Sequence, residues 1–218
     1  MQVLACFVVL TGVAAAGDSA PAADPWEKDI RAFEERDRQQ PPPQDAVLFL
    51  GSSTIRIWDL KKSFPDLVTI NRGFGGSQFA DSARYADRIV IPCRPKAIVI
   101  YAGDNDIAGG KTPEQVSADF DALIAAIRRG LPDVRIIALS IKASPARWDK
   151  YPKMQQVNAH LKEAATKDAH LAYVDVGTCL FGDDGKPRAD LFKKDGLHLN
   201  DEGYEAWAKI LRPVLAGK

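Results

Sequence analysis

The sequence predicts an α/β domain in which a parallel five-stranded sheet is covered by helices on both faces. Five short apolar runs alternate along the chain with segments of helical periodicity. Several of these runs are apolar at every position, as in Ala46–Leu50, which is typical of strands buried on both faces. Strands that alternate with helices form parallel sheets through right-handed crossovers, so the sheet lies between two layers of helices.

Length and composition favour a single globular domain. The 218 residues are 46% hydrophobic, which is enough for one well-buried core and too few for two. Lys plus Arg equals Asp plus Glu, at 29 each, so no overall charge attracts nucleic acid or an anionic membrane. The sequence contains no zinc-type Cys/His cluster, and we predict no metal site and no cofactor.

The N-terminal segment has the pattern of an export signal. Residues 1–16 combine an apolar run with Ala14-Ala15-Ala16, a small-residue cleavage pattern, and the run is too short to span a membrane. We therefore predict a signal peptide at 1–16, a linker and N-terminal helix at 17–44, and the main domain at 45–218, in a periplasmic or secreted protein. The alternative for residues 1–16 is a buried first strand.

The remaining elements follow from periodicity, caps and turn residues. Asp24 and Pro25 mark the start of the first helix, and Pro41-Pro42-Pro43 ends it. The expected strands are Asp45–Leu50, Leu67–Ile70, Lys96–Tyr101, Val134–Leu139 and Leu171–Val176. The expected helices are Trp26–Gln39, one following the first strand through Lys62, Asp81–Ile91, Pro113–Arg129, Lys150–Lys167 and Asp201–Leu215, the last capped by Asn200. Two Gly-rich stretches, Asn71–Gln78 and Gly103–Lys111, are expected to be loops.

Two cysteines, Cys93 and Cys179, would remain after cleavage at residue 16. Cys93 precedes one predicted strand and Cys179 follows another, which places them at opposite ends of a parallel sheet, roughly 15–20 Å apart. This separation is beyond the reach of a disulfide. We predict two free thiols.

The segment after the first strand presents hydroxyl groups where such sheets bind ligands. Gly51 ends the strand and Ser52-Ser53-Thr54 begins a helix, at the carboxyl edge of the sheet. A serine there can act as a nucleophile if a base and a group that orients the base lie nearby. Alternatively, the hydroxyls only cap the helix, as Ser and Thr at that position usually do.

The sequence offers one histidine at the same edge. His160 falls within a predicted helix and His170 at the opposite edge of the sheet, whereas His198 directly precedes the last helix. Asp195 stands three residues before His198, a separation that a turn can close. A DxxH match by itself can arise by chance.

Two loops at this edge carry groups suited to stabilising an oxyanion. In Asn71–Gln78, the glycines leave room for a main-chain N–H to approach a substrate oxygen. In Gly103–Lys111, Asn105 offers a neutral amide donor. The alternatives are a plain turn and an asparagine that only braces its own loop.

These four segments together resemble the SGNH branch of the GDSL esterase/lipase family, including its platelet-activating-factor acetylhydrolase-like branch. The resemblance covers roughly residues 45–215. Gly51-Ser52-Ser53 corresponds to the nucleophile block, with Ser52 where the family has Asp, and the G-x-S register favours Ser53 over Ser52. The other blocks correspond to Asn71–Gly76, Gly103–Asp106 and Asp195–His198.

The resemblance implies a flavodoxin-like, three-layer sandwich with the SGNH hydrolase fold, and a serine esterase without cofactor. It assigns Ser53 as nucleophile, His198 as base and Asp195 as its orienting partner. It assigns the N–H groups of Ser53 and Gly76 and the Asn105 side chain to the oxyanion hole.

The substrate is less constrained than the chemistry. We expect short acyl chains, acetate first, on a small molecule or a glycan, with lysophospholipids or thioesters as the alternative. In Ser140–Trp148, Arg147 and Trp148 are candidates for lining the substrate pocket, with a solvated Arg and a packing Trp as the alternative. The alternative that is not an enzyme is an exported binding protein, which has the same fold but does not turn over a substrate.

Overall fold

The computed structural model describes residues 24–217, and the predicted signal peptide at 1–16 lies outside them. The sheet contains five parallel strands in the order β2-β1-β3-β4-β5, which confirms the predicted fold class. The strands are β1 (Val47–Gly51), β2 (Thr69–Gly73), β3 (Ala97–Tyr101), β4 (Arg135–Leu139) and β5 (Leu171–Val174). The strand order reverses at β1, and the carboxyl edge beside that point is where such sheets bind ligands.

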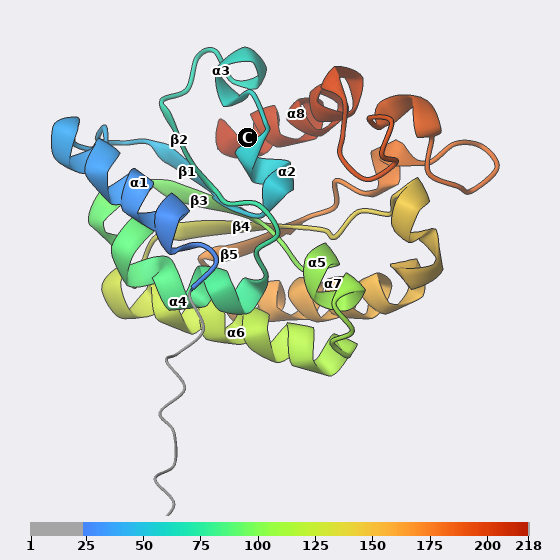
Figure 1. Ribbon diagram of the computed structural model, residues 1–218, viewed down its shortest axis with the longest axis horizontal. Helices are drawn as coiled ribbons and strands as arrows, with labels where there is room; N and C mark the ends of the chain where they lie inside the picture. The colour runs from blue at the N-terminus through green and yellow to red at the C-terminus, as the bar shows by residue number, and fades with distance from the viewer. Residues whose placement is uncertain (1–23, 218) are drawn as a thin grey trace, which may run out of the picture.

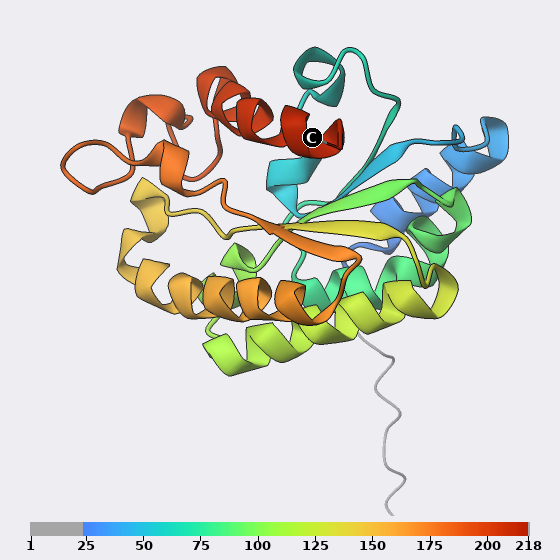
Figure 2. The same ribbon diagram turned by 180° about the vertical axis from the view of Figure 1, so that it is seen from behind.

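Eight helices surround the sheet in the described residues. They are α1 (Glu27–Gln39), α2 (Ser53–Arg56), α3 (Leu60–Ser63), α4 (Phe79–Ile89), α5 (Asp104–Ala108), α6 (Pro113–Gly130), α7 (Tyr151–Lys167) and α8 (Asp201–Leu215). Short 3₁₀ segments lie at η1 (Ile91–Cys93), η2 (Pro145–Lys150), η3 (Thr178–Leu180) and η4 (Ala189–Leu191). Figures 1 and 2 show α1, α4, α6 and α7 on one face of the sheet and α2, α3 and α8 on the other.

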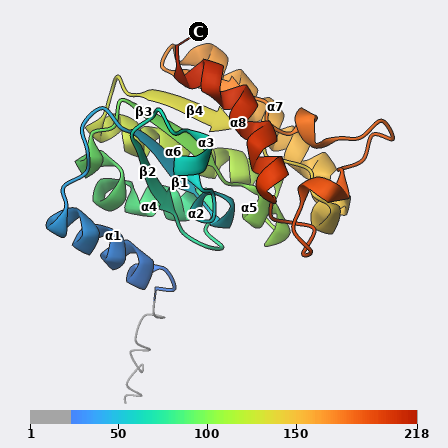
Figure 3. The same ribbon diagram turned by 90° about the horizontal axis from the view of Figure 1, so that it is seen from above.

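The two layers of the core follow the alternation of side chains along each strand. Leu48 and Leu50 point into the core beneath α1, α4, α6 and α7, whereas Val47 and Phe49 point into the core beneath α8. Figure 3 looks down on the second layer, where α8 lies across the sheet. All five residues of β1 are buried, as expected for a central parallel strand.

The long helices begin where the sequence carries capping residues. Thr112 accepts a hydrogen bond from the Gln115 N–H, and the Gln115 side chain accepts from the Thr112 N–H, which forms a capping box at the start of α6. Asn200 accepts from the Gly203 N–H and caps α8, as predicted. The bounds of these helices accordingly differ little from expectation.

Two of the sequence predictions for the carboxyl edge of the sheet are wrong. β2 begins at Thr69, inside the predicted strand Leu67–Ile70, and extends through Gly73. Its last three residues, Asn71–Gly73, were expected in a loop but are part of the strand because they pair with Phe49–Gly51 of β1. The segment Gly103–Lys111 contains the short helix α5, which begins after Gly103, a residue with a φ of 103°. Polar and glycine-rich stretches conceal these elements from a search for apolar periodicity.

The predicted helix through Lys62 is also wrong, since it is broken into α2 and α3. Asp59 interrupts it by accepting from the Lys62 N–H, which starts a second helix. The break allows Trp58 to turn inward, where its ring stacks on Tyr204 and its N–H donates to Ser63. Burial of this indole offsets the loss of the continuous helix.

The cysteine prediction is confirmed, since Cys93 and Cys179 are both free thiols. Cys93 is buried beside Arg72, and burial raises the pKa of its thiol. Among residues 24–217, no helix has the length and apolarity needed to cross a membrane.

Helix α1 is held to the sheet by a buried arginine on β2. Arg72 is only 2% exposed, and its guanidinium bonds both oxygens of Asp37 at 2.5–2.6 Å and the Ile89 carbonyl at 3.0 Å. The ring of Phe33 lies 5.1 Å from the guanidinium carbon. The charge is therefore paired and enclosed, the condition under which removal of one partner is costly.

We predict that Asp37→Ala lowers the free energy of unfolding by about 2 kcal/mol, because it leaves the Arg72 guanidinium buried without its carboxylate. Glu35→Ala, on the same helix, removes an exposed pair with Arg38 and should change stability by less than about 0.5 kcal/mol. Urea unfolding of both variants beside the wild type measures the difference. Equal effects would contradict the importance of the buried pair.

Asp106 links α5 to α4 through a buried carboxylate. Its side chain is fully buried, and Oδ1 accepts from the Phe79 N–H at 3.3 Å, with the Lys111 ammonium 3.5 Å away. Burial raises the pKa of Asp106 from 3.8 to about 6, and the attraction of Lys111 only partly opposes this. The folded protein thus binds a proton at Asp106 more tightly than the unfolded chain does.

We predict a pH-dependent stability difference between the wild type and Asp106→Asn. The folded-state pKa is raised, so the stabilising effect of protonation is complete below pH 3.8 and lost as the pH rises through about 6. Relative to that of Asp106→Asn, the free energy of unfolding of the wild type should decrease by about 2–3 kcal/mol between pH 4 and pH 7. Denaturant titrations at several pH values test this, and a difference that stays constant with pH would contradict it.

Candidate active site

The turn between β1 and α2 presents Ser53 at the carboxyl edge of the sheet. Gly51 has a φ of 151°, and a Cβ at this position would lie 1.9 Å from the Tyr101 carbonyl oxygen, so only glycine fits. The Ser52 N–H donates to the same carbonyl at 3.3 Å. The chain therefore leaves the sheet beside β3, and Ser53 becomes the first residue of α2.

The two adjacent serines have different environments. Ser52 is 1% exposed, and its hydroxyl has no hydrogen-bond partner and does not cap α2. Ser53 is partly exposed, and its Oγ lies 2.8 Å from Nε2 of His198. Of the two hydroxyls, only that of Ser53 contacts a base.

The segment before α8 supplies that base and its orienting partner. Nδ1 of His198 lies 2.6 Å from Oδ2 of Asp195, and Oδ1 of Asp195 accepts from the Leu197 and His198 N–H groups at 2.9 and 3.0 Å. Gly196, with a φ of 63°, allows this tight turn. Its carbonyl accepts from the Ala146 N–H at 3.0 Å, which joins the turn to η2.

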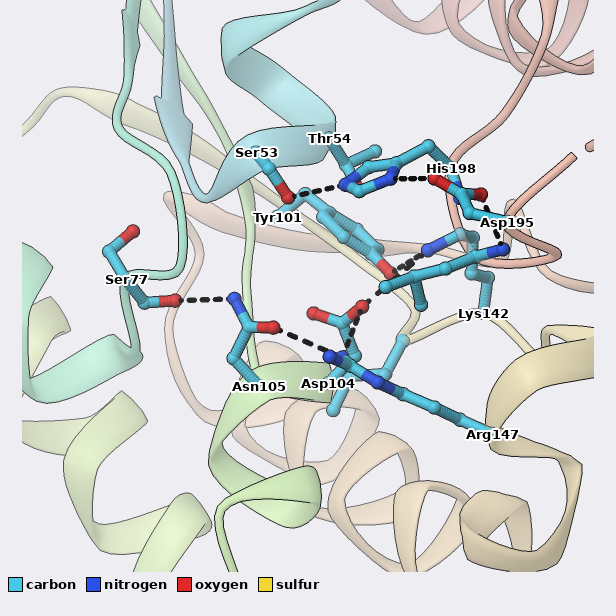
Figure 4. A network of polar contacts seen from close by, with 12 residues as sticks. Ser53, Thr54, Ser77, Tyr101, Asp104, Asn105, Lys142, Arg147, Asp195 and His198 are labelled. Atoms are coloured by element: carbon cyan, nitrogen blue, oxygen red, sulfur yellow. Dashed lines mark hydrogen bonds and ion pairs between the residues drawn. The ribbon is translucent and has the colours of Figure 1, made fainter. Parts of the chain in front are cut away.

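Hydrogen bonds keep Asp195 ionised. Partial burial by itself would raise the pKa of the Asp195 carboxyl, but the bonds from the His198 ring and the two N–H groups outweigh it and hold the pKa well below the usual range. An ionised Asp195 accepts the Nδ1–H of His198, so Nε2 is free to accept the Ser53 proton. Figure 4 shows the three side chains in line.

The structure also brings the two predicted oxyanion loops together. The Asn105 Nδ2 donates to the Ser77 carbonyl at 3.1 Å, so the loop after β2 contacts the start of α5. Gly76 directly precedes Ser77, is exposed, and has a φ of 79°. The Ser53 N–H is at the first position of α2, where helix N–H groups have no intrahelical acceptor.

The two candidate pocket residues in η2, Arg147 and Trp148, have different surroundings. Nη1 of Arg147 donates to Oδ1 of Asn105 at 3.0 Å, so this side chain reaches the predicted oxyanion residue. Trp148 is 39% exposed and stacks on Tyr151, with ring centroids 5.6 Å apart, beside Phe181. The structure thus brings Arg147 to the site and places Trp148 in an aromatic surface cluster.

Three further residues near Asn105 were not among the predicted site residues. The carboxylate of Asp104 lies 3.1 Å from Nη1 of Arg147 and 3.6 Å from the Lys142 ammonium, which donates to the Tyr101 hydroxyl at 3.0 Å (Figure 4). Lys142 is fully buried, and burial lowers the pKa of its ammonium although Asp104 opposes the shift. The one signal in the sequence is that charged residues closely follow two largely apolar strands.

The other two histidines lie outside this site. His160 is on α7 and bonds Asp121, and His170 precedes β5 at the opposite edge of the sheet, as predicted. Within residues 24–217, no group of three His, Cys, Asp or Glu side chains is arranged to hold a metal ion.

Comparison with known families and proteins identifies relatives. Residues 58–206 match the GDSL-like lipase/acylhydrolase family, a range that includes Gly76, Asn105, Asp195 and His198 and begins after Ser53. The chain is 28% identical to the platelet-activating factor acetylhydrolase IB subunit alpha2 of Gallus gallus, over 91% of this chain and 90% of that protein.

Solved structures share the fold. A GDSL-like lipase from Bacteroides thetaiotaomicron has a TM-score of 0.75 and 20% identity, over 87% of this chain and 98% of that one. An acetyl-xylooligosaccharide esterase from Geobacillus stearmophilus has a TM-score of 0.64 and 16% identity, over 78% of this chain and 94% of that one. Since the family match spans more than half of the sequence, the protein belongs to the GDSL-like lipase/acylhydrolase family, whose members hydrolyse ester bonds.

Proposed function

We propose that this protein is a serine esterase that hydrolyses carboxylic esters through an acyl-enzyme on Ser53. The observation that carries the proposal is the continuous chain of hydrogen bonds from Ser53 Oγ through the His198 ring to Asp195. A nucleophile, a base and a group that orients the base, all within 3 Å of their partners, are the parts that acyl transfer needs.

The first half of the reaction forms the acyl-enzyme. His198 Nε2 takes the Ser53 proton as Oγ attacks the ester carbonyl, and Asp195 stabilises the resulting imidazolium. The negative charge moves to the carbonyl oxygen, where N–H groups of Ser53 and Gly76 and the Asn105 amide would donate to it. His198 then gives its proton to the leaving alcohol as the tetrahedral intermediate collapses.

The second half repeats the chemistry with water. His198 removes a proton from water, which attacks the acyl carbon of the ester on Ser53. The second tetrahedral intermediate is stabilised by the same donors. When it collapses, Oγ leaves with the proton from His198, and the free acid departs.

A short acyl chain, acetate first, is the substrate that we propose. The Asp195 side chain is 47% exposed and that of His198 23% exposed, so the base and its orienting partner are accessible to solvent. The Gallus gallus relative is named an acetylhydrolase, and a protein of the same fold is an acetyl-xylooligosaccharide esterase. These names support an acetyl ester, with acetylated carbohydrate as the first natural class to assay.

We predict that Ser53→Ala lowers kcat/KM for p-nitrophenyl acetate by at least about 10³-fold, because the nucleophile is lost. Ser52→Ala is the matched control: it removes a buried hydroxyl that has no partner and should change the rate by less than about twofold. Trapping of the acetyl group on Ser53, detected by mass spectrometry, identifies the nucleophile directly. Full activity of Ser53→Ala would reject the assignment.

The same assay separates the proposal from its alternatives. Acetate turned over faster than butyrate or octanoate supports a short-chain esterase, whereas a preference for octanoate supports a lysophospholipase or thioesterase type of acylhydrolase. Ligand binding without turnover of any ester by the wild type would support a binding protein on the same fold.

A further inference from the structure

We propose that Arg147 is a positioning residue that fixes the amide of Asn105 for the oxyanion and strengthens its N–H as a donor. The inference rests on the proposed esterase function and assigns to Arg147 a role other than lining the substrate pocket. It follows from a line of contacts that runs from the buried Lys142 through Asp104 and Arg147 to Asn105 (Figure 4).

Two hydrogen bonds hold the Asn105 amide in one orientation, one accepted by its oxygen and one donated by its nitrogen. Its Oδ1 accepts from Arg147 Nη1 at 3.0 Å, and its Nδ2 donates to the Ser77 carbonyl at 3.1 Å. A guanidinium only donates and a carbonyl only accepts, so rotation of the amide by 180° would lose both bonds. Nδ2 carries two hydrogens, and the one not used by Ser77 is available to a substrate oxygen.

Arg147 is itself anchored by the residue next to Asn105. Nη1 lies 3.1 Å from Oδ2 of Asp104, whose side chain is 5% exposed, while that of Arg147 is 18% exposed. Lys142, fully buried, lies 3.6 Å from the same oxygen. Because Asp104 and Asn105 are consecutive at the start of α5, one guanidinium fixes the anchor and the amide together.

The charge of Arg147 also acts on the amide. The guanidinium of Arg147 is positively charged, and its hydrogen bond to Oδ1 draws electron density away from Nδ2. The Nδ2–H then becomes a better donor to an oxyanion than an unpolarised amide would be. Because the oxyanion forms only in the transition state, the benefit should appear in kcat and not in KM.

A double-mutant cycle with the full chain and p-nitrophenyl acetate tests this role. Asn105→Ala removes an oxyanion donor and should lower kcat by about 10²–10³-fold. Arg147→Ala should lower kcat at least about tenfold, with KM changed by less than about twofold. In the Asn105→Ala background the same Arg147→Ala change should cost less than about twofold, since the group on which it acts is gone. Equal factors in both backgrounds would overturn the proposal.

A conservative variant separates charge from geometry. Arg147→Lys keeps the positive charge but replaces the rigid, planar guanidinium, whose Nη1 contacts both Asp104 and Asn105, with a flexible ammonium. Its kcat should fall between those of the wild type and Arg147→Ala. Arg147→Lys activity below that of Arg147→Ala would contradict a role in which the charge helps.

Arg128→Ala provides a matched control for loss of a partly buried ion pair. The Arg128 side chain is also 18% exposed, pairs with Asp168 at 2.9 Å and bonds the Val134 carbonyl ahead of β4, at the opposite edge of the sheet. Its removal should lower the melting temperature about as much as Arg147→Ala does, while kcat stays within about twofold of the wild type. If Arg128→Ala lowers kcat as much as Arg147→Ala, the effect is general destabilisation and the proposal fails.

The outcome for Arg147 is distinguishable from that for the function. If Ser53→Ala abolishes turnover while Arg147→Ala matches the wild type, the esterase stands and the inference is wrong. The rate at which an aryl fluorophosphonate labels Ser53 gives a second readout that does not depend on the natural ester. If the wild type shows neither ester turnover nor labelling, both the proposed function and this inference are rejected.

Discussion

The contact between Gly51 and the carbonyl of Tyr101 is the constraint from which the site is built. A Cβ at Gly51 would lie 1.9 Å from that oxygen, so the absence of a side chain lets β1 end directly beside β3. Gly73 has the same role on β2. A Cβ at this position would lie 2.1 Å from the Arg56 backbone nitrogen, so the absence of a side chain lets β2 end directly against α2. Strands β1, β2 and β3 thereby deliver Ser53, Gly76 and Asn105 to the same edge.

The base reaches this edge from the far end of the chain. Ser53 and His198 are 145 residues apart and are joined by one hydrogen bond of 2.8 Å. The turn that carries His198 is rigid by itself, because Asp195 accepts three hydrogen bonds from residues 197 and 198. Packing of α8 against α3 and the sheet then places that turn over Ser53. Local turn chemistry sets the pair Asp195–His198, and helix packing sets its distance from the nucleophile.

The cluster of Lys142, Asp104 and Arg147 departs from what stability alone favours. Removing charges from water is expensive, and a buried ion pair is often no more stable than apolar side chains of the same size. In return, the charges specify one arrangement of α5 relative to η2, because Arg147 bonds both Asp104 and Asn105. The same reasoning applies to Arg72 and Asp37, which fix α1 against the sheet but lie away from the site. A buried charge in this protein thus marks a place where orientation matters.

The sequence alone determined the parallel sheet, the layers of helices and the capped ends of α6 and α8, because apolar periodicity and local hydrogen bonds control these features. It also singled out Ser53, Asn105, Asp195 and His198 as candidates, since each falls beyond a predicted strand or before a capped helix. Tertiary structure decided the features that a local sequence pattern does not encode. Asn71–Gly73 became a strand through pairing with β1, and the polar stretch after β3 became α5. Only the fold shows that the Ser53 hydroxyl lies beside His198 while that of Ser52 is buried without a partner. The contact of Arg147 with Asn105 likewise joins residues that are 42 positions apart in the sequence. Contacts between distant segments carry no local periodicity, so only the folded chain reveals them.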